Sequence, residues 1–205
     1  MRHFKKTAAL LLTTAVLFTG KMTLDLNVSG NEAKTAIIHV EQIHTEKREP
    51  EPTARIYSIP LADELQEYTF GLCKENDLDY EMVLAMMDRE SDYREKMISK
   101  TNDYGLMQIN EVNHGWLKTE LGIEDFLDAE QNILAGVRML SELTGKYEDP
   151  HQALMAYNSG EAGAKRLWGQ GKTTSEYSRS IMARAEELRK EAEGCQSHAA
   201  SATAH

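Results

Sequence analysis

The 205-residue sequence contains few residues that interrupt helices, with only four prolines and thirteen glycines. No segment of useful length alternates apolar and polar residues, which argues against a sheet-based core. Runs of glutamate, lysine, alanine, leucine and methionine favour helices instead. The sequence therefore predicts an all-α protein with one compact domain and extensions.

The chain has cysteines and histidines, but they are not spaced as in a typical metal site. Neither a CxxC nor an HExxH pattern occurs, and the tail histidines His198 and His205 lie too far apart for a site on one helix turn. We therefore expect no metal and no cofactor. Of the two cysteines, we interpret Cys73 as a buried free thiol, whereas a disulfide with Cys195 would require an exported protein.

Negative charge exceeds positive charge in this chain, with 33 acidic and 23 basic residues. The net charge is −10, and without the four basic residues of segment 1–21 it would be −14. A protein that binds a nucleic acid duplex needs the opposite sign, so we expect no nucleic acid partner. A neutral or peptide-bearing polymer is electrostatically easier to bind.

The N-terminal segment 1–21 is typical of an export signal. Three basic residues precede an apolar run from Thr7 to Phe18, which is shorter than the roughly 20 residues that span a bilayer. The segment could be cleaved, or it could remain as a membrane anchor. We therefore expect an exported protein that acts outside the membrane, at the cell wall or in the periplasm.

The rest of the chain divides by composition into three parts. Residues 22–56 include the charged, proline-containing stretch EKREPEP and are predicted to be a flexible spacer. Residues 57–193 carry helical periodicity and are the expected catalytic domain. Residues 194–205 are small and polar and are predicted to be a disordered tail. Expected helices run over residues 60–76, 80–90, 129–145, 150–158 and 175–193.

Two of these helices have an expected N-cap. Asp79 should cap the helix over 80–90, and Asp128, with Gln131 three residues later, resembles a capping box for the helix over 129–145. The expected apolar stripe of that helix consists of Ile133, Val137, Leu140 and Leu143. The expected inward face of the last helix consists of Ile181, Ala185 and Leu188.

Glu90 is a candidate acid/base because of its place on a helix. In the helix over residues 80–90, Val83, Met86 and Met87 share one face, and Glu90 lies on that face one turn further along. A carboxyl on an apolar face is partly desolvated, so its pKa should rise. A glutamic acid that stays protonated near neutral pH can donate a proton to a leaving oxygen. The alternative is an ordinary solvated glutamate near a helix end.

Three short sequence motifs occur in this order along the chain: ES at 90–91, GLMQIN at 105–110 and AYNSG at 156–160. With these motifs, the sequence resembles the soluble lytic transglycosylases, which are similar to goose-type lysozymes. The resemblance covers residues 57–189 and implies a lysozyme-like helical domain with a cleft. It departs from the family at residues 92–98 and at Thr173, where the family often has a glutamate.

The resemblance implies that Glu90 is the only catalytic carboxylate and that the partner is a peptidoglycan glycan strand. Glu90 would protonate the oxygen between N-acetylmuramic acid and N-acetylglucosamine, and would then deprotonate the muramic C6 hydroxyl to give a 1,6-anhydro end. Tyr157 would orient Glu90. The other residues expected to bind substrate are Ser91, Ser99, Gly105, Met107, Gln108, Asn110, Asn158 and Tyr177. Ser99 could instead be a turn residue, and Met107 could instead pack in the core.

Two other functions remain open from the sequence. A hydrolase of the same fold would use water and would leave a reducing muramic end, with Asp103, or less well Asp92, as the carboxylate that positions the water. The second of these functions is non-catalytic: the protein would bind glycan or take part in an assembly. A further expectation is local opening of the wall for a secretion or conjugation machine, because the chain combines a small domain, a spacer and an N-terminal segment.

Overall fold

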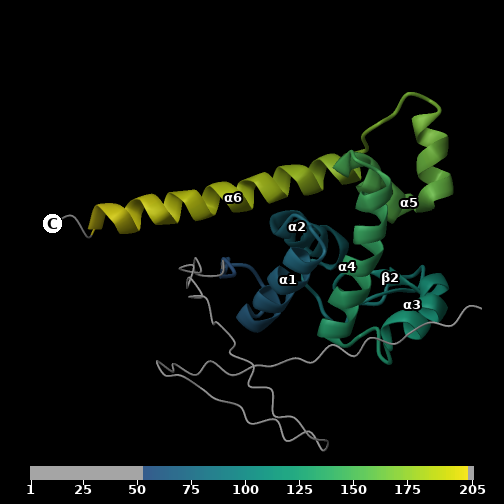
Figure 1. The fold of residues 1–205 in the computed structure, drawn as a ribbon, viewed down its shortest axis with the longest axis horizontal. Helices are drawn as coiled ribbons and strands as arrows, with labels where there is room; N and C mark the ends of the chain where they lie inside the picture. Colours follow the sequence, from purple (N-terminus) through teal and green to yellow (C-terminus); the bar gives the residue numbers. More distant parts are fainter. Residues whose placement is uncertain (1–52, 203–205) are drawn as a thin grey trace, which may run out of the picture. The chain divides into compact units, whose positions relative to one another are not determined.

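The computed structural model describes the backbone of residues 53–202 and the side chains of residues 53–193. The expected export segment 1–21 and residues 22–52 of the expected spacer lie outside these residues. The elements follow the order α1 (Asp63–Glu75), α2 (Tyr80–Ser91), β1 (Asp103–Tyr104), β2 (Ile109–Asn110), η1 (Glu111–Asn113), α3 (His114–Leu121), α4 (Ala129–Lys146), α5 (Pro150–Trp168) and α6 (Glu176–Ala202) (Figure 1). The predicted all-α class is confirmed.

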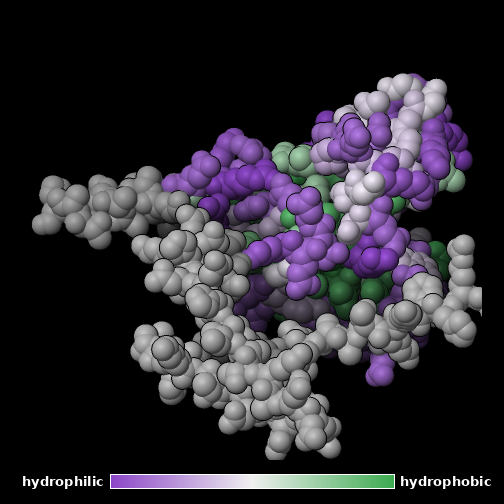
Figure 2. All heavy atoms as spheres, viewed as in Figure 1, coloured by the Kyte–Doolittle hydropathy of each residue, from purple (hydrophilic) through white to green (hydrophobic). Residues whose placement is uncertain are grey.

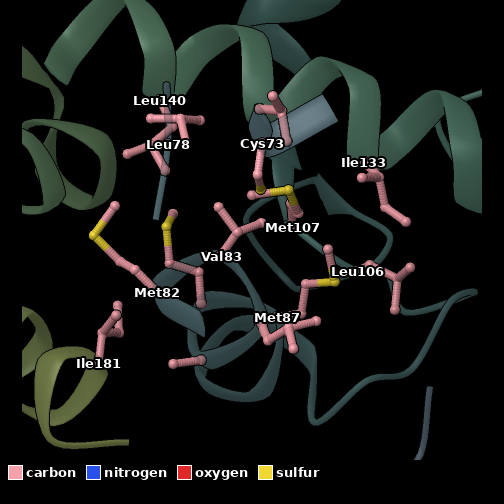
Figure 3. Close-up of a cluster of buried hydrophobic side chains, with 14 of the residues drawn as sticks. Cys73, Leu78, Met82, Val83, Met87, Leu106, Met107, Ile133, Leu140 and Ile181 are labelled. Carbon is pink, nitrogen blue, oxygen red and sulfur yellow. The ribbon is translucent and has the colours of Figure 1, made fainter. Parts of the chain in front are cut away.

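Helix α2 is the central helix of this fold. It begins after Asp79, whose side chain accepts a hydrogen bond from the backbone N–H of Met82, as an N-cap residue should. Residues 82–87 are all buried, so α2 is covered on nearly every side, chiefly by α6 and also by α1. Residues 82–87 are apolar on every side of the helix, and such a segment belongs in a core. Figure 3 shows Met82, Val83 and Met87 of α2 facing Leu140 and Ile133 of α4 and Ile181 of α6.

Helix α4 begins at the predicted cap, although the local hydrogen bonds differ from the expected capping box. Asp128 accepts from the backbone N–H of Gln131. The Gln131 side chain does not return to Asp128; it accepts from the N–H groups of Glu124 and Asp125 and so fixes the preceding loop. The predicted apolar stripe is confirmed at Ile133, Val137 and Leu140, which are buried, and continues to the half-buried Leu143.

Helix α5 is longer than the sequence predicted. Residues 150–158 are helical as expected, but the helix resumes after a break at Gly160 and ends at Trp168. Gly160 has φ 66° and ψ 157°, a conformation that is essentially restricted to glycine. The break lets the chain change direction after Asn158. The Glu161 carboxylate then accepts from Lys146 (2.5 Å) and from the Tyr147 hydroxyl (2.6 Å), which joins the second half of α5 to the end of α4.

The tail prediction is wrong for residues 194–202. Helix α6 continues to Ala202, past Gly194, where the sequence analysis placed the end of the ordered chain. Residues 192–202 include four alanines, and alanine has the highest helix propensity, so a single glycine costs too little to end the helix. The predicted inward face of α6 is confirmed, because Ile181, Ala185 and Leu188 are fully buried.

The two strands and α3 were missed by the sequence analysis. Strands β1 and β2 pair antiparallel, with Asp103 opposite Asn110 and Tyr104 opposite Ile109. Each strand has only two residues, which is too short to show an alternating pattern. This hairpin follows α2 closely along the chain and carries the GLMQ motif in its turn.

The described part of the chain has a mostly hydrophilic surface on the face drawn in Figure 2, and hydrophobic side chains gather between the outer half of α5 and the elements below it. Within residues 53–202, no helix combines the length and the apolar character needed to cross a bilayer. Among the same residues, no group of three or more histidine, cysteine or acidic side chains is arranged to hold a metal ion. Cys73 is a free thiol buried in the core, and the side chain of Cys195 lies outside the described residues.

Candidate active site

The carboxyl of Glu90 occupies a desolvated position in the last turn of α2. Val83, Met86 and Met87, on the same face of the helix, are fully buried, as predicted. The pKa of Glu90 is raised to about 7, chiefly by burial and also by the nearby charge of Asp103, against an opposing hydrogen bond from Tyr177. Glu90 therefore has an appreciable protonated fraction at neutral pH, and it can both give and take a proton.

Tyr177 holds the Glu90 carboxyl in place. Its hydroxyl donates a short hydrogen bond to Glu90 Oε1 from the first turn of α6. The ring is buried, so the hydroxyl has little freedom to turn elsewhere. The Tyr177 pKa lies well above its ordinary value, because of burial and because of the neighbouring Glu90 charge, so Tyr177 remains a donor. Tyr177, which was expected to bind substrate, thus contacts the Glu90 carboxyl directly.

The expectation that Tyr157 orients Glu90 is wrong. The Tyr157 hydroxyl donates to the backbone carbonyl of Met107, 2.9 Å away, and ties α5 to the hairpin turn. Tyr157 is nevertheless close enough to feel the Glu90 charge, which contributes, after burial, to raising its pKa. Asn158 follows on α5 with its side chain exposed, where it is accessible to a ligand. Tyr177 makes the contact that was expected of Tyr157, because α6, and not α5, brings a tyrosine hydroxyl to the end of α2.

Asp103 carries the second carboxylate near Glu90, and it is held in a different way. Its Oδ2 accepts from the hydroxyls of Ser99 (2.6 Å) and Thr101 (2.5 Å), and its Oδ1 accepts from the Asn110 amide (2.7 Å). Burial raises the pKa of Asp103, but these three hydrogen bonds outweigh it and leave the pKa lowered. Asp103 is therefore ionised, and each of its oxygens accepts at least one hydrogen bond.

Ser99 and Asn110 therefore differ from their expected role as substrate-binding residues. Ser99 is the turn residue of the alternative interpretation, because its hydroxyl also accepts from the backbone N–H groups of Thr101 and Asp103. Asn110 donates to the Thr101 carbonyl as well as to Asp103, and its own oxygen accepts from Val112 N at the start of η1. In this structure both residues shape the hairpin that carries Asp103.

Ser91 is buried and faces the backbone instead of a cleft. Its hydroxyl lies 3.0 Å from the carbonyl oxygen of Met87 and 2.9 Å from that of Leu106, so it bridges α2 and the hairpin turn. Only 1 % of the residue is exposed, which leaves no surface for a sugar to contact. The expectation that Ser91 binds substrate is wrong; the residue positions the turn relative to Glu90.

Met107 and Gly105 also serve the core. Met107 is fully buried, lies against Gly136 of α4, and appears among the core side chains in Figure 3, so the core interpretation holds and the expected groove position is wrong. Gly105 has φ +73°, and a β-carbon there would overlap the side chain of Asn132. The close approach that requires glycine is therefore to Asn132 and not to a sugar.

Gln108 closes the turn that Gly105 opens. Its side-chain amide donates to the Gly105 carbonyl (2.9 Å) and its backbone has φ 47°, a left-handed conformation that non-glycine residues adopt rarely. The side chain is half-buried, so part of it remains accessible. Accessible surface also remains on other expected site residues, since Asn158 is exposed and partial exposure is shared by Glu90, Ser99, Asn110 and Tyr157.

Asn132 is the residue of this region that the sequence analysis missed. It is fully buried on α4, its Oδ1 accepts from the Met107 N–H (2.8 Å), and its amide donates to the carbonyls of Tyr104 (2.8 Å) and Phe126 (2.9 Å). The available signal was a lone asparagine next to Ile133 in an apolar stripe. Because buried polar groups require partners, such a residue indicates a backbone segment that needs hydrogen bonds from it.

The fold is that of a lysozyme-like helical domain, with a desolvated glutamate at the end of a buried helix. Residues 67–180, more than half of the chain, match the transglycosylase SLT domain family. The chain belongs to this family.

Named relatives agree with this assignment. The chain is 37% identical over 89 residues to the membrane-bound lytic murein transglycosylase F of Desulfosudis oleivorans, covering 40% of this chain and 19% of that protein. It is 29% identical over 129 residues to the protein of the same name from Nitrosospira multiformis, covering 60% and 26% respectively. The chain thus spans about a quarter or less of the length of these curated relatives.

Solved structures show the same fold. The lytic transglycosylase Slt of Pseudomonas aeruginosa matches with a TM-score of 0.55 at 18% identity, over 65% of this chain and 25% of that one. The soluble 70-kDa lytic transglycosylase of Escherichia coli matches with a TM-score of 0.55 at 19% identity, over 64% and 25%. At these identities the likeness concerns the fold alone.

Proposed function

We propose that this protein is a peptidoglycan lytic transglycosylase. It cleaves the β-1,4 bond between N-acetylmuramic acid and N-acetylglucosamine and leaves a 1,6-anhydromuramic end. The observation that carries the proposal is the desolvated Glu90 carboxyl, whose pKa is raised to about 7 and whose Oε1 is held by Tyr177. Membership of the transglycosylase SLT domain family supports the choice of substrate class.

The reaction needs one group that first gives and then takes a proton. Protonated Glu90 donates its proton to the glycosidic oxygen, and the bond from that oxygen to the muramic C1 breaks. The substrate's N-acetyl group stabilises the positive charge that develops at C1. The Glu90 carboxylate then removes the proton of the C6 hydroxyl while O6 bonds to C1. Glu90 ends protonated as it began, and no water enters the product.

The state of Asp103 supports this route over hydrolysis. A glycosidase that uses water normally needs a second carboxylate free to act as a base or a nucleophile. Hydrogen bonds from Ser99, Thr101 and Asn110 lower the Asp103 pKa and so make this carboxylate a weaker base. Asp92, the other sequence candidate, is exposed at the C-cap of α2. Asp103 therefore acts as a fixed charge that raises the Glu90 pKa.

Mass spectrometry of the muropeptides released from purified peptidoglycan tests the proposal. The full-length protein should release anhydromuropeptides, and the Glu90→Gln variant should release almost none. Glu148→Gln, at an exposed glutamate before α5, is the matched control and should behave as wild type. Reducing ends in place of anhydro ends would make the protein a hydrolase. Release by neither protein, with binding to peptidoglycan retained, would favour the non-catalytic glycan-binding function.

We also propose export to the cell wall or periplasm, because the substrate lies there and segment 1–21 has the composition of an export signal. Attachment to a membrane through that segment, and local wall opening for a secretion or conjugation machine, are narrower proposals. Fractionation of cells that produce the full-length protein tests the attachment to a membrane. Soluble protein that has lost residues 1–21 would contradict an anchor, and full-length protein in the membrane fraction would support one.

A further inference from the structure

His151, the second residue of α5, contacts the residue that follows Tyr177 on α6. Its Nδ1 lies 3.0 Å from the hydroxyl oxygen of Ser178. Ser178 is fully buried, and His151 is half-buried. Either tautomer of the imidazole can form this hydrogen bond, because a hydroxyl both donates and accepts. The reaction steps proposed for Glu90 do not use this contact.

Ser178 belongs to the turn that begins α6. Its hydroxyl accepts from the backbone N–H of Ser175 at 3.0 Å, and its own N–H donates to the Ser175 hydroxyl at 3.1 Å. This reciprocal pair has the pattern of a capping box, in which two side chains satisfy free N–H groups of a first turn. A side chain that holds Ser178 therefore holds the first turn of α6, and Tyr177 with it.

The chain that precedes α6 does little to fix this turn. Residues 169–173 are exposed, so this part of the loop after α5 is not packed into the core. The first turn also carries Glu176, which pairs with Arg89 of α2 at 2.8 Å, but both side chains are exposed. Exposed ion pairs hold a structure weakly, because water and salt screen them. Of these two contacts, the hydrogen bond between Ser178 and α5 is the firmer.

The start of α5 is a rigid support for His151. The Asp149 side chain caps the helix by accepting from the His151 N–H at 2.8 Å, and Pro150 occupies the first helical position, which suits its fixed φ. Ala153 and Leu154, in the same turn, are fully buried. The imidazole therefore extends from a well-anchored helix end to the start of α6.

We propose that His151 is a positioning residue for the reaction, which fixes the first turn of α6 through Ser178 and so keeps the Tyr177 hydroxyl on the catalytic carboxyl. This inference rests on the proposed function of Glu90. It assigns His151 no contact with the substrate and no proton transfer.

The groups around Glu90 determine the sign of the expected effect. The Tyr177 hydrogen bond and the Arg89 charge lower the Glu90 pKa, whereas burial and the Asp103 charge raise it. Release of the first turn of α6 weakens the Tyr177 hydrogen bond. Loss of the His151 contact should therefore raise the Glu90 pKa, as loss of the Tyr177 hydroxyl itself does.

Carbon-13 nuclear magnetic resonance titration of the Glu90 carboxyl in the full-length protein tests the proposal without requiring turnover. His151→Leu keeps a bulky side chain but loses the hydrogen bond, so the Glu90 midpoint should rise toward that of Tyr177→Phe. His151→Asn keeps a polar atom attached to Cγ and should keep the wild-type midpoint. Ser178→Ala removes the same hydrogen bond from its other partner and should give the same rise. An unchanged midpoint in His151→Leu and Ser178→Ala would overturn the proposal.

A double-mutant cycle separates positioning from a direct effect of charge. A protonated His151 would itself lower the Glu90 pKa, so its removal alone would also raise that pKa. In a Tyr177→Phe background, His151→Leu should leave the Glu90 midpoint where it is, because no hydroxyl remains to be positioned. An equal rise in both backgrounds would show that His151 acts by its charge and would overturn the proposal.

Kinetics on purified peptidoglycan give an independent readout. His151→Leu should lower kcat by no more than Tyr177→Phe does, with KM unchanged, and His151→Asn should retain the wild-type kcat. A rise in KM at unchanged kcat would mean that His151 affects binding of the strand, which contradicts a positioning role. Absence of cleavage by the wild type would refute the proposed function, and the titration would still decide whether His151 holds Tyr177 on Glu90.

Discussion

Two carboxylates lie near each other in this site, and their surroundings drive them to opposite states. Glu90 sits at the end of a buried helix with Tyr177 as its hydrogen-bond partner, and burial raises its pKa to about 7. Asp103 sits on a two-residue strand among three side-chain donors, which lower its pKa despite partial burial. The comparison shows how one site obtains opposite pKa shifts from the same functional group; in the proposed reaction Glu90 is the proton carrier and Asp103 the fixed charge.

The largest expected effect comes from removing the proton carrier. Glu90→Gln keeps the size and hydrogen-bonding ability of the side chain but removes its titration. General acid/base catalysis contributes about 10²–10⁴ in rate, so we expect roughly a thousandfold lower release of muropeptides at pH 6–7. Loss of less than about tenfold would show that another group carries the proton.

The same substitution should stabilise the protein at high pH. The folded-state pKa of Glu90, about 7, lies above its ordinary value of 4.5, so the native state binds the proton more tightly. Wild-type stability should therefore fall as pH rises from about 4.5 to about 7, by up to roughly 3 kcal/mol. Urea unfolding at pH 4 and pH 8 measures this. Glu90→Gln should gain stability over wild type at pH 8 and none at pH 4, and equal stabilities at pH 8 would contradict the desolvation of Glu90.

Replacing the fixed charge should have a smaller effect than replacing the proton carrier. Asp103→Asn removes a negative charge that raises the Glu90 pKa, so the pH profile of kcat/KM should move to lower pH. We expect about a tenfold loss of activity, because the hydrogen bonds from Ser99 and Thr101 to Asp103 also weaken. If Asp103→Asn instead abolished activity as fully as Glu90→Gln, Asp103 would be a second catalytic carboxylate and hydrolysis would be favoured.

The smallest expected effect concerns the tyrosine on Glu90. The hydrogen bond from Tyr177 lowers the Glu90 pKa, so Tyr177→Phe should raise that pKa and shift the alkaline limb of the profile upward, with a few-fold loss of rate. Tyr157→Phe is the matched control, since its hydroxyl binds the Met107 carbonyl and not Glu90. A larger shift from Tyr157→Phe than from Tyr177→Phe would reverse the assignment made from the structure.

The features that were predicted from the sequence depend on local spacing. Glu90 follows Val83 by seven residues, so helical periodicity alone places both on one face, and the raised pKa follows from that. The N-caps at Asp79 and Asp128 are equally local, because each bonds an N–H three residues away. These predictions were confirmed.

The features that were missed depend on contacts between distant segments. Whether Gly105 and Met107 face a cleft or the core is decided by Asn132, which is 25 residues after Met107 and fills the space beside the turn. Which tyrosine reaches Glu90 is decided by the packing of α6 on α2, over a separation of 87 residues. A motif identifies such residues as a set, but their individual directions come from the tertiary structure.

The most direct test of the central claim is a titration of the Glu90 carboxyl carbon by carbon-13 nuclear magnetic resonance, assigned by comparison with Glu90→Gln. The desolvated site predicts a midpoint near pH 7, moving upward in Tyr177→Phe. A midpoint near 4.5 in the wild type would mean that Glu90 is a solvated, ionised carboxylate at neutral pH. It could not then serve as the acid that begins the reaction.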